Sequence, residues 1–206
     1  MLIDILEVGM YLANCYIIGC EKTRKGIIID PGDNGDFILS KIKKNNIEVE
    51  KVVLTHGHLD HIGAVEYLRD TLNARVCIHE ADAEMLFSAD KNLSQDMPEP
   101  VETEPAEVLL KEGMFIEFGE EKLKVLHTPG HTKGGISLVG DGVVFTGDAL
   151  FLGSVGRTDL PGGDFEELMN SIREKLFALP DETIVYSGHG PDTTIGQEKQ
   201  YNPFVR

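Results

Sequence analysis

Four potential metal ligands fall within six residues of the chain, in the stretch THGHLDH: His56, His58, Asp60 and His61. The apolar, β-branched run VVL at 52–54 comes immediately before this stretch and predicts a buried strand. The ligands are therefore expected at the C-terminal end of a strand, where α/β sheets keep their sites. In an extended turn, residues two apart point the same way, so His56 and His58 should face together. One cation cannot conveniently bind all four side chains, and the pattern favours two adjacent cations if other segments supply the remaining ligands.

Three further candidate ligands also follow predicted strands and are flanked by glycine. They are His131 in HTPGHT, Asp148 in FTGD and His189 in SGHG. Glycine lets the backbone approach an ion closely, because it adopts backbone angles that other residues avoid. Imidazole and carboxylate groups suit zinc, iron and manganese. By contrast, we predict that His79 and His127 are ordinary core or surface residues.

Other common site patterns are absent from the sequence. It contains no GxGxxG or P-loop pattern for nucleotide binding and no GxSxG pattern for a serine nucleophile. The histidine and aspartate turns are therefore the chemistry-bearing feature of the chain.

Hydrophobic periodicity and turn residues predict the elements that must position these side chains. In the first half, strands are expected at 2–8, 15–20, 26–30, 52–54 and 75–79, with helices ending near 45, at about 61–72 and at 80–87. Asp33 or Asp36 is expected to cap the first of these helices. In the second half, strands are expected near 107–110, 115–118, 122–127, 135–139, 143–146 and 183–186. A D-x-x-E signature at Asp164 and Glu167 begins another helix, which Pro180 ends.

The stretch from 88 to about 106 interrupts this pattern with three prolines and several acidic residues. A loop of that length is either a functional lid or a solvated surface segment, and the sequence leaves both open. Two sheet-plus-helix halves with one site between them predict a single domain, 1–206, in the α/β class. The expected architecture is a four-layer αββα sandwich, with two mixed β-sheets flanked by helices.

Composition limits the partners and the compartment. The formal net charge of −16 at pH 7 disfavours nucleic acid, which binds basic surfaces. The first residues have no basic segment typical of a signal peptide, and no stretch approaches the ~20 apolar residues that span a bilayer. Cys15, Cys20 and Cys77 show no CxxC spacing and are expected to fill core volume without disulfides. We therefore expect a cytoplasmic protein, monomeric or homodimeric, with no membrane partner.

Four motifs, THGHLDH, HTPGHT, FTGDALF and SGHG, occur in an order that resembles the metallo-β-lactamase superfamily. Within it, the chain is most similar to the glyoxalase II-like group, the hydroxyacylglutathione hydrolases. The resemblance implies the αββα fold and a dinuclear site. His56, His58 and His131 would hold one divalent metal ion, Asp60, His61 and His189 the other, and Asp148 would bridge them. Zinc is the first expectation for both ions, with iron or manganese as alternatives.

The resemblance also implies a reaction. A metal-bridging hydroxide would attack a small thioester resembling an S-2-hydroxyacylglutathione, with Asp60 and Asp148 as catalytic ligands. Two cations about 3.5–4 Å apart lower the pKa of water enough for this role and stabilise the oxyanion. A thiolate leaves readily, so no dedicated general acid is required. The expected partner is thus a small-molecule thioester, with a glutathione conjugate as one form.

Two departures from the longer glyoxalase II enzymes bear on the substrate. Those enzymes carry a C-terminal helical domain that contacts glutathione, whereas this sequence ends about 17 residues after His189 and resembles the short bacterial type. The stretch GSVGRTDLPGG also resembles persulfide dioxygenases, in which a single iron is held by the counterparts of His56, His131 and Asp148. A glutathione-persulfide dioxygenase, and a hydrolase of another small ester or lactone, therefore remain as alternatives. A metal-binding module without catalysis is a third, less favoured reading.

Two other branches of the superfamily fit the sequence less well. The metallo-β-lactamases themselves usually lack the Asp60–His61 pairing and the bridging Asp148, and they are secreted. The nucleases carry an additional domain and act on a polyanion.

The substrate contacts are the least determined part of the prediction. Arg157 is the best candidate to bind a substrate carboxylate through a bidentate pair, unless it forms an ion pair with Asp159 or Asp164 instead. Lys133 in HTKGG and Tyr16 on the second predicted strand are weaker candidates.

Overall fold

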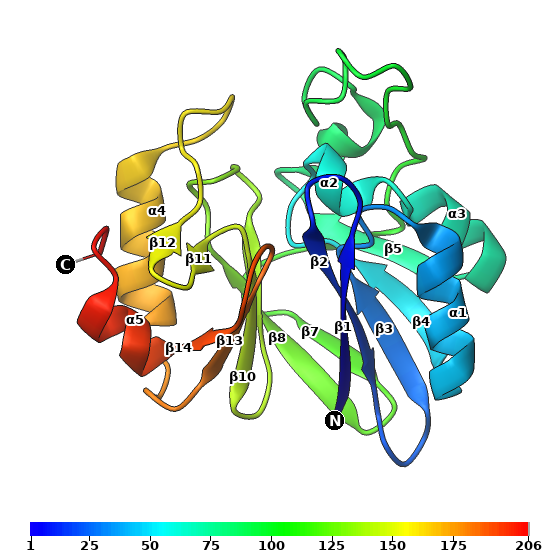
Figure 1. Ribbon diagram of the computed structural model, residues 1–206, viewed down its shortest axis with the longest axis horizontal. Helices are drawn as coiled ribbons and strands as arrows, with labels where there is room; N and C mark the ends of the chain where they lie inside the picture. The colour runs from blue at the N-terminus through cyan, green and yellow to red at the C-terminus, as the bar shows by residue number, and fades with distance from the viewer. Residues whose placement is uncertain (206) are drawn as a thin grey trace.

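Two six-stranded sheets face each other in the computed structural model, which describes residues 1–205, and helices cover the outer face of each sheet (Figure 1). The first sheet has the order β1-β2-β3-β4-β5-β6. Its strands are β1 (Leu2–Val8), β2 (Ala13–Gly19), β3 (Lys25–Ile29), β4 (Glu48–Val53), β5 (Arg75–His79) and β6 (Val108–Leu110). β1, β2 and β3 are antiparallel, and β3 to β6 are parallel. The crossovers between parallel strands contain α1 (Gly35–Asn45) and α3 (Val65–Leu72).

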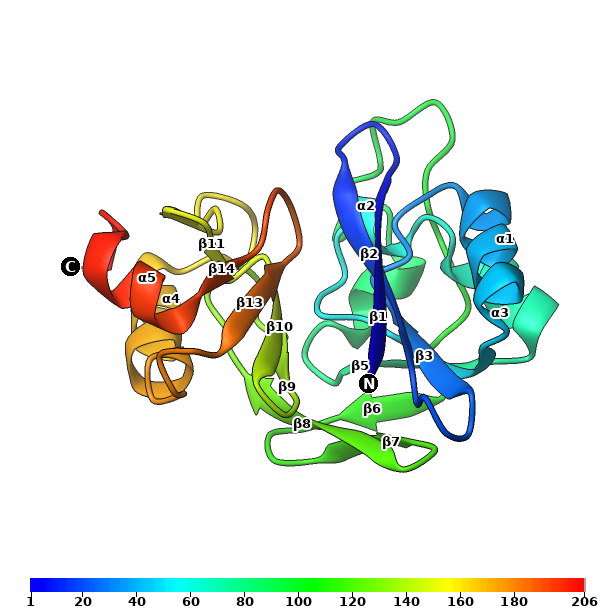
Figure 2. The same ribbon diagram turned by 60° about the horizontal axis from the view of Figure 1, so that its bottom comes forward.

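The second sheet has the order β14-β13-β10-β9-β8-β7. Its strands are β7 (Phe115–Phe118), β8 (Glu121–His127), β9 (Ile136–Val139), β10 (Val143–Gly147), β13 (Ile184–Ser187) and β14 (Thr193–Thr194). α4 (Phe165–Ser171), which runs on into a π-helical turn at Ile172–Leu176, and α5 (Ile195–Tyr201) cover its outer face, and β11 (Leu150–Phe151) pairs with β12 (Ser154–Val155). Figure 2 shows β6, β7 and β8 together at the junction of the two halves.

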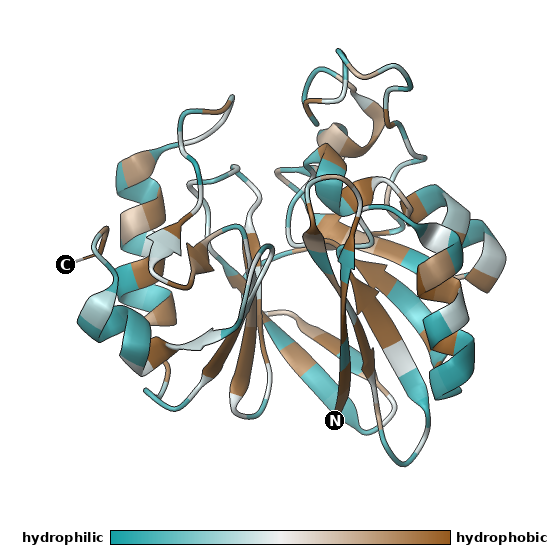
Figure 3. Cartoon of the chain, in the orientation of Figure 1, coloured by the Kyte–Doolittle hydropathy of each residue, from teal (hydrophilic) through white to brown (hydrophobic). Residues whose placement is uncertain are grey.

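Alternation along the strands explains the four layers, because successive side chains point to opposite faces of a sheet. On β3, Ile27 and Ile29 pack between the two sheets, whereas Ile28 packs under the helices of the first half. On β10, Phe145 faces the first sheet and Val144 faces α4. Both faces of the central strands are therefore apolar (Figure 3). The buried side chains form three clusters that fill the three interfaces of an αββα sandwich, as the sequence predicts.

Each predicted strand is present, but the helix expected at about 61–72 is divided. α2 (Leu59–Ile62) ends at Gly63, and α3 begins at Val65. The backbone of Gly63 lies so close to the loop after β3 that a Cβ there would be 2.3 Å from the carbonyl oxygen of Gly32. The Ala64 N–H donates to the Pro31 carbonyl instead of continuing the helix. This long-range contact breaks a periodicity that reads as continuous in the sequence.

The two predicted helix caps have different outcomes. Asp164 accepts a hydrogen bond from the Glu167 N–H at 3.0 Å, as the D-x-x-E signature indicates. At α1, however, neither Asp33 nor Asp36 is the cap, and that prediction is wrong. The position before the helix belongs to Asn34, whose φ of 54° is left-handed and whose side chain accepts from the Gly9 N–H instead. The helix expected at 80–87 is reduced to a 3-10 turn, η1 (Ala83–Phe87).

The loop at 88–106 contains no helix or strand, yet it is anchored to the first half. The buried Asn92 side chain donates to the carbonyls of Met85 and Val101. The Asn92 carbonyl accepts from the Leu59 N–H at 3.0 Å, at the start of α2. The loop therefore supports the segment that carries Asp60 and His61.

Cys15, Cys20 and Cys77 are free and buried, as expected. None of the helices formed by residues 1–205 is long and apolar enough to cross a membrane.

The cluster between the sheets predicts where truncation costs most. Phe145 is fully buried there, so Phe145→Ala should lower the free energy of unfolding by about 3–5 kcal/mol. Phe115→Ala removes the same atoms from a side chain that is 50% exposed and should cost less than about 1 kcal/mol. Urea denaturation of both variants measures the difference. Equal losses would show that the packing between the sheets does not dominate stability.

Candidate metal centre

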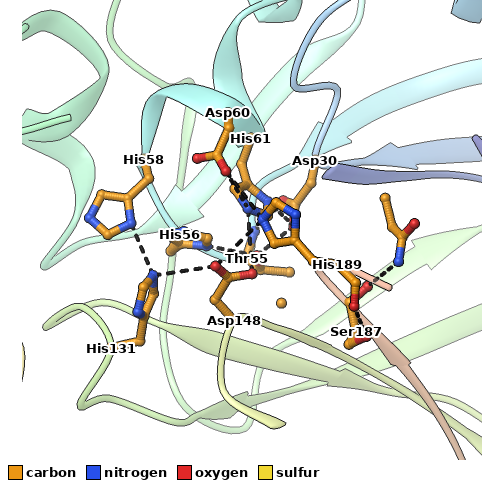
Figure 4. Close-up of polar contacts among 12 residues, drawn as sticks. Asp30, Thr55, His56, His58, Asp60, His61, His131, Asp148, Ser187 and His189 are labelled. Carbon is orange, nitrogen blue, oxygen red and sulfur yellow. Dashed lines mark hydrogen bonds and ion pairs between the residues drawn. The ribbon is translucent and has the colours of Figure 1, made fainter. Parts of the chain in front are cut away.

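The seven predicted ligands come from five chain segments that meet at one edge of both sheets. His56 and His58 follow β4, and Asp60 and His61 lie on α2. His131 follows β8, Asp148 follows β10 and His189 follows β13. Figure 4 shows their side chains converging on one small volume from the two halves of the molecule.

The side chains form two groups with Asp148 between them. In the first, the ligand atoms of His56, His58 and His131 lie within 4.8 Å of one another. The second group, Asp60, His61 and His189, meets the same limit. Asp148 Oδ2 lies 3.6 Å from His131 Nε2 in the first group, and 3.7 Å from His189 Nε2 in the second. Asp30, His56 and His61 also meet this limit, so the division of the ligands between two ions that the family resemblance implies stays a prediction.

Unpaired buried atoms test whether these residues fit metal ions. His56 Nε2, His61 Nε2 and Asp148 Oδ1 are buried without a hydrogen-bond partner among the described residues. A buried polar atom left without a partner costs about 1–3 kcal/mol, so several of them in one place need an explanation. Lone pairs aimed into a shared volume suit divalent cations, and the residues fit the pair that the fold implies.

Partners on the far side of each ring determine which nitrogen faces inward. The Nδ1–H of His61 donates to the Asp30 carboxylate at 3.0 Å. His131 and His189 donate from Nδ1 to the backbone carbonyls of Arg157 and Tyr11, at 2.7 and 3.1 Å. In each ring the Nε2 lone pair is thereby left for the centre, an arrangement typical of metal-binding histidines.

Thr55 connects this outer layer. Its hydroxyl donates to Asp30 at 2.5 Å and lies 3.2 Å from His56 Nδ1, from which it accepts. Asp30 also accepts from the Thr55 N–H at 2.7 Å. One buried carboxylate thus orients ligands of both groups.

The two groups differ in the charge that they favour. Burial lowers the pKa of His61, but the carboxylates of Asp148, Asp60 and Asp30 outweigh burial and raise this pKa to about 10. At His58, burial and the neighbouring His131 lower the pKa to about 3, so its ring is neutral. The second group therefore favours positive charge, and the first offers neutral nitrogen ligands.

Two functional residues escape the sequence motifs, and Asp30 is the first. It directly follows β3 and precedes a Pro-Gly turn, so its only sequence signal is an aspartate just after a strand. Asp82 is the second, at the start of η1 and 1% exposed. Its carboxylate accepts from the Thr132 hydroxyl and the Gly134 N–H, both at 2.6 Å, and from the Gly57 N–H. It therefore joins the turn of His56 and His58 to the turn of His131.

The predicted substrate contacts lie in three different environments. The Arg157 guanidinium forms a bidentate ion pair with Asp159, at 3.0 and 2.7 Å, beside the centre. Lys133 borders a neighbouring hollow near Asp82 and does not line the one over the ligands. Tyr16 is buried between the sheets against Phe145, and its hydroxyl donates to the Ser187 carbonyl.

A hollow of about 480 Å³ opens over the ligands. Besides ligand side chains, its wall contains mostly apolar and aromatic residues, among them Tyr11, Leu59, Leu93 and Phe151. Asp60, Asp148 and His189 line this hollow, so a small molecule can reach the centre.

His79 and His127 lie apart from the centre. Their rings stack with centroids 4.1 Å apart and planes at 10°, and His127 Nε2 donates to the Lys133 carbonyl at 2.8 Å. Because the two rings are stacked and nearly parallel, their nitrogen lone pairs do not converge on one point and the pair is not arranged to bind a metal ion.

Comparison with known proteins gives the family of this chain. The profile described as "Metallo-beta-lactamase superfamily" matches residues 8–189. The chain belongs to the metallo-β-lactamase superfamily. Two relatives span nearly the same length: "Hydroxyacylglutathione hydrolase GloC" of Haemophilus influenzae is 37% identical over 100% of this chain and 98% of its own. "Probable metallo-hydrolase YqgX" of Bacillus subtilis is 38% identical over 97% of this chain and 95% of its own.

Three solved structures of superfamily members are similar over almost the whole chain. One named "BLEG-1 B3 metallo-beta-lactamase" has a TM-score of 0.94 at 38% identity, with 99% of each chain covered. "TTHA1623 in a di-iron-bound form" has a TM-score of 0.87 at 37% identity, covering 98% of this chain and 99% of that one. "ETHE1 from Myxococcus xanthus" has a TM-score of 0.83 at 33% identity, covering 98% and 84%. Membership and the metallo-hydrolase relatives identify the chain as a metal-dependent enzyme of the hydrolase type.

The outer carboxylate generates a prediction about metal affinity. Asp30→Asn removes a negative carboxylate that holds the His61 ring and attracts a cation. We therefore expect zinc to bind about 10–100-fold more weakly in the second group. Asp70→Asn, a matched change at an exposed position of α3, should leave affinity unchanged. Titration calorimetry measures both. An unaltered affinity in Asp30→Asn would show that Asp30 does not support the ligands.

The histidines at 127 and 131 provide a second contrast. His131→Ala removes a ring nitrogen that faces both His58 and Asp148, so the variant should bind one metal ion fewer per chain. His127→Ala should keep the full complement, since this ring stacks on His79 and donates to the Lys133 carbonyl. Elemental analysis of dialysed protein decides, and loss of metal in His127→Ala would contradict the assignment of ligands.

Proposed function

We propose that this enzyme hydrolyses small thioesters, resembling the S-2-hydroxyacylglutathione hydrolases. The observation that carries the proposal is a complete set of seven inward-facing ligands, with Asp148 between the two groups, at the floor of an accessible hollow. The name of the Haemophilus influenzae relative agrees with it. A reading as a metal-binding module without catalysis gives no reason for a substrate-sized hollow over the ligands.

In this proposal the seven ligands are assigned to two metal ions. His56, His58 and His131 would hold one ion, Asp60, His61 and His189 the other, and Asp148 would contact both. When bound, such cations lower the pKa of water and polarise a carbonyl group. Zinc, iron and manganese all suit this donor set.

Asp60 has a further role at the surface of the hollow. Burial raises its pKa, but His61 and His189 outweigh burial and hold the pKa of this carboxyl below its usual range. Asp60 therefore remains an acceptor at neutral pH, and it can orient a water molecule toward a bound carbonyl. The water oxygen would add to the carbonyl carbon and release a proton to solvent, giving a tetrahedral oxyanion. The carbon–sulfur bond would then break, and the sulfur would leave as a thiolate because a thiol of this kind has a pKa of about 8.5.

One alternative is oxygen chemistry on a persulfide with a single iron. His131 and Asp148 lie 3.6 Å apart beside His56, so the three residues needed for that site are together. The structural similarity to ETHE1 favours this alternative. One tightly held iron per chain and oxygen uptake with a glutathione persulfide would support it over hydrolysis.

Another alternative is hydrolysis of a different small ester, a lactone or a β-lactam. A β-lactam should be assayed because the chain is structurally similar to a protein named as a B3 metallo-β-lactamase, although the sequence motifs disfavour this substrate. A panel of thioester, lactone and β-lactam substrates on one metal-analysed preparation ranks these activities.

The bridging position generates the test of mechanism. Asp148→Asn should lower thioester kcat by on the order of 100-fold and reduce metal occupancy, because an amide cannot offer a charged oxygen to both groups. Asp141→Asn, exposed in the turn before β10, is the matched control and should keep the wild-type rate. Thiol release measured with a chromogenic disulfide reports both rates. Full activity in Asp148→Asn would overturn the bridging role, and no thiol release by the wild-type protein with zinc, iron or manganese would overturn the function.

A further inference from the structure

The hollow over the ligands has a neighbour beside the turn between β1 and β2. Tyr11, Leu59 and Asp60 line both, and the second has a volume of about 290 Å³. A molecule whose reactive group lies at the ligands can therefore contact residues of both hollows through these three shared residues.

Apolar side chains dominate the path that leads away from the ligands. Leu93, Phe151 and Leu160 line the first hollow, and Met97 and Val101 line the second. Tyr11 stands between them, 50% exposed. Such a wall favours a hydrocarbon or aromatic tail, because binding removes apolar surface from water.

Charged groups along the same path disfavour a carboxylate. Apart from the ligands, Arg157 is the one lysine or arginine that lines either hollow within residues 1–205. Asp159 occupies the Nε and Nη2 donors of its guanidinium, the edge that would otherwise grip a carboxylate. The second hollow adds Asp33 and Glu99 and no basic residue among those described. A carboxylate away from the ligands would therefore meet apolar side chains and the like charges of Asp33 and Glu99.

We propose that the site selects thioesters with uncharged, apolar thiol or acyl tails, and that Asp159 is a specificity-determining residue that excludes anionic carriers by neutralising Arg157. Glutathione, with two carboxylates and one ammonium group, belongs to the disfavoured class. This inference rests on the proposed function, but it concerns the tail of the substrate and can be tested by binding alone.

The test compares a thioether with a derivative in which both carboxylates are blocked, on the zinc-loaded enzyme. S-hexylglutathione and its diethyl ester share the same apolar tail, differ in two carboxylates and cannot be hydrolysed at sulfur. Titration calorimetry should show the diester binding about five- to tenfold more tightly, with the ratio falling as salt is raised. Equal binding, tighter binding of the diacid, or no binding of either compound would each overturn the proposal.

Variants separate the role of Asp159 from the general charge of the protein. Asp159→Asn frees Arg157 and should tighten binding of the diacid about threefold while leaving the diester little changed. Glu166→Gln removes the same charge from an exposed position on α4 and should change neither affinity. If Asp159→Asn leaves the diacid-to-diester ratio as in the wild-type protein, Asp159 does not determine specificity.

Failure of this inference and failure of the proposed function give different results. A diacid that binds better, with thioesters still hydrolysed, overturns the inference alone. Tighter binding of the diester without turnover of any thioester overturns the function and leaves the binding preference intact.

Discussion

The metal centre depends on two sheets keeping a fixed position relative to each other, because its ligands come from both. The apolar layer between the sheets supplies most of this rigidity, and polar contacts near the ligands complete it. The Ile136 N–H donates to the Thr55 carbonyl at 2.9 Å, which joins the strand before His56 to the second sheet. Asn14 on β2 donates to the carbonyls of Ser187 and Gly190 on either side of His189. Each contact reaches from one half to a ligand-bearing turn of the other.

Around that frame, the centre is ordered in two shells of different chemistry. Several inner atoms, among them His56 Nε2, His61 Nε2 and Asp148 Oδ1, are buried without a hydrogen-bond partner in the described part of the chain, which is unfavourable by itself. Hydrogen bonds from the outer partners fix the orientation of the histidine rings, which would otherwise be free to rotate. Asp30 and Asp82 are both buried carboxylates in this outer layer, but Asp30 acts on ring orientation and Asp82 on the spacing of two turns. Buried carboxylates that accept several hydrogen bonds thus fix the orientation of their neighbours, which a hydrophobic contact would not do because it has no preferred direction.

Much of this could be predicted from the sequence, and the remainder has physical reasons. The ligands stand out because they combine a preceding apolar strand with glycine-flanked turns. The layer order follows from alternation along strands such as β3. The break at Gly63 and the role of Asp30 depend on contacts between segments that are about 25 to 30 positions apart, which no local pattern encodes. Tyr16 is a pocket candidate in the sequence because its strand lies beside the site, but alternation turns its ring into the layer between the sheets. Tyr11, in the preceding turn, lines the hollow instead.

Tyr11 and Arg157 share a feature with a consequence for evolution. Each holds a histidine through its backbone carbonyl, while its side chain lines the hollow. A carbonyl is present whatever the residue type, so substitutions at these two positions can change what the hollow accepts while the histidines stay in place. At each position the side chain thus affects which substrates fit, whereas the backbone carbonyl supports the metal ligand. A lineage can explore new substrates at these positions without passing through forms that have lost the metal ions.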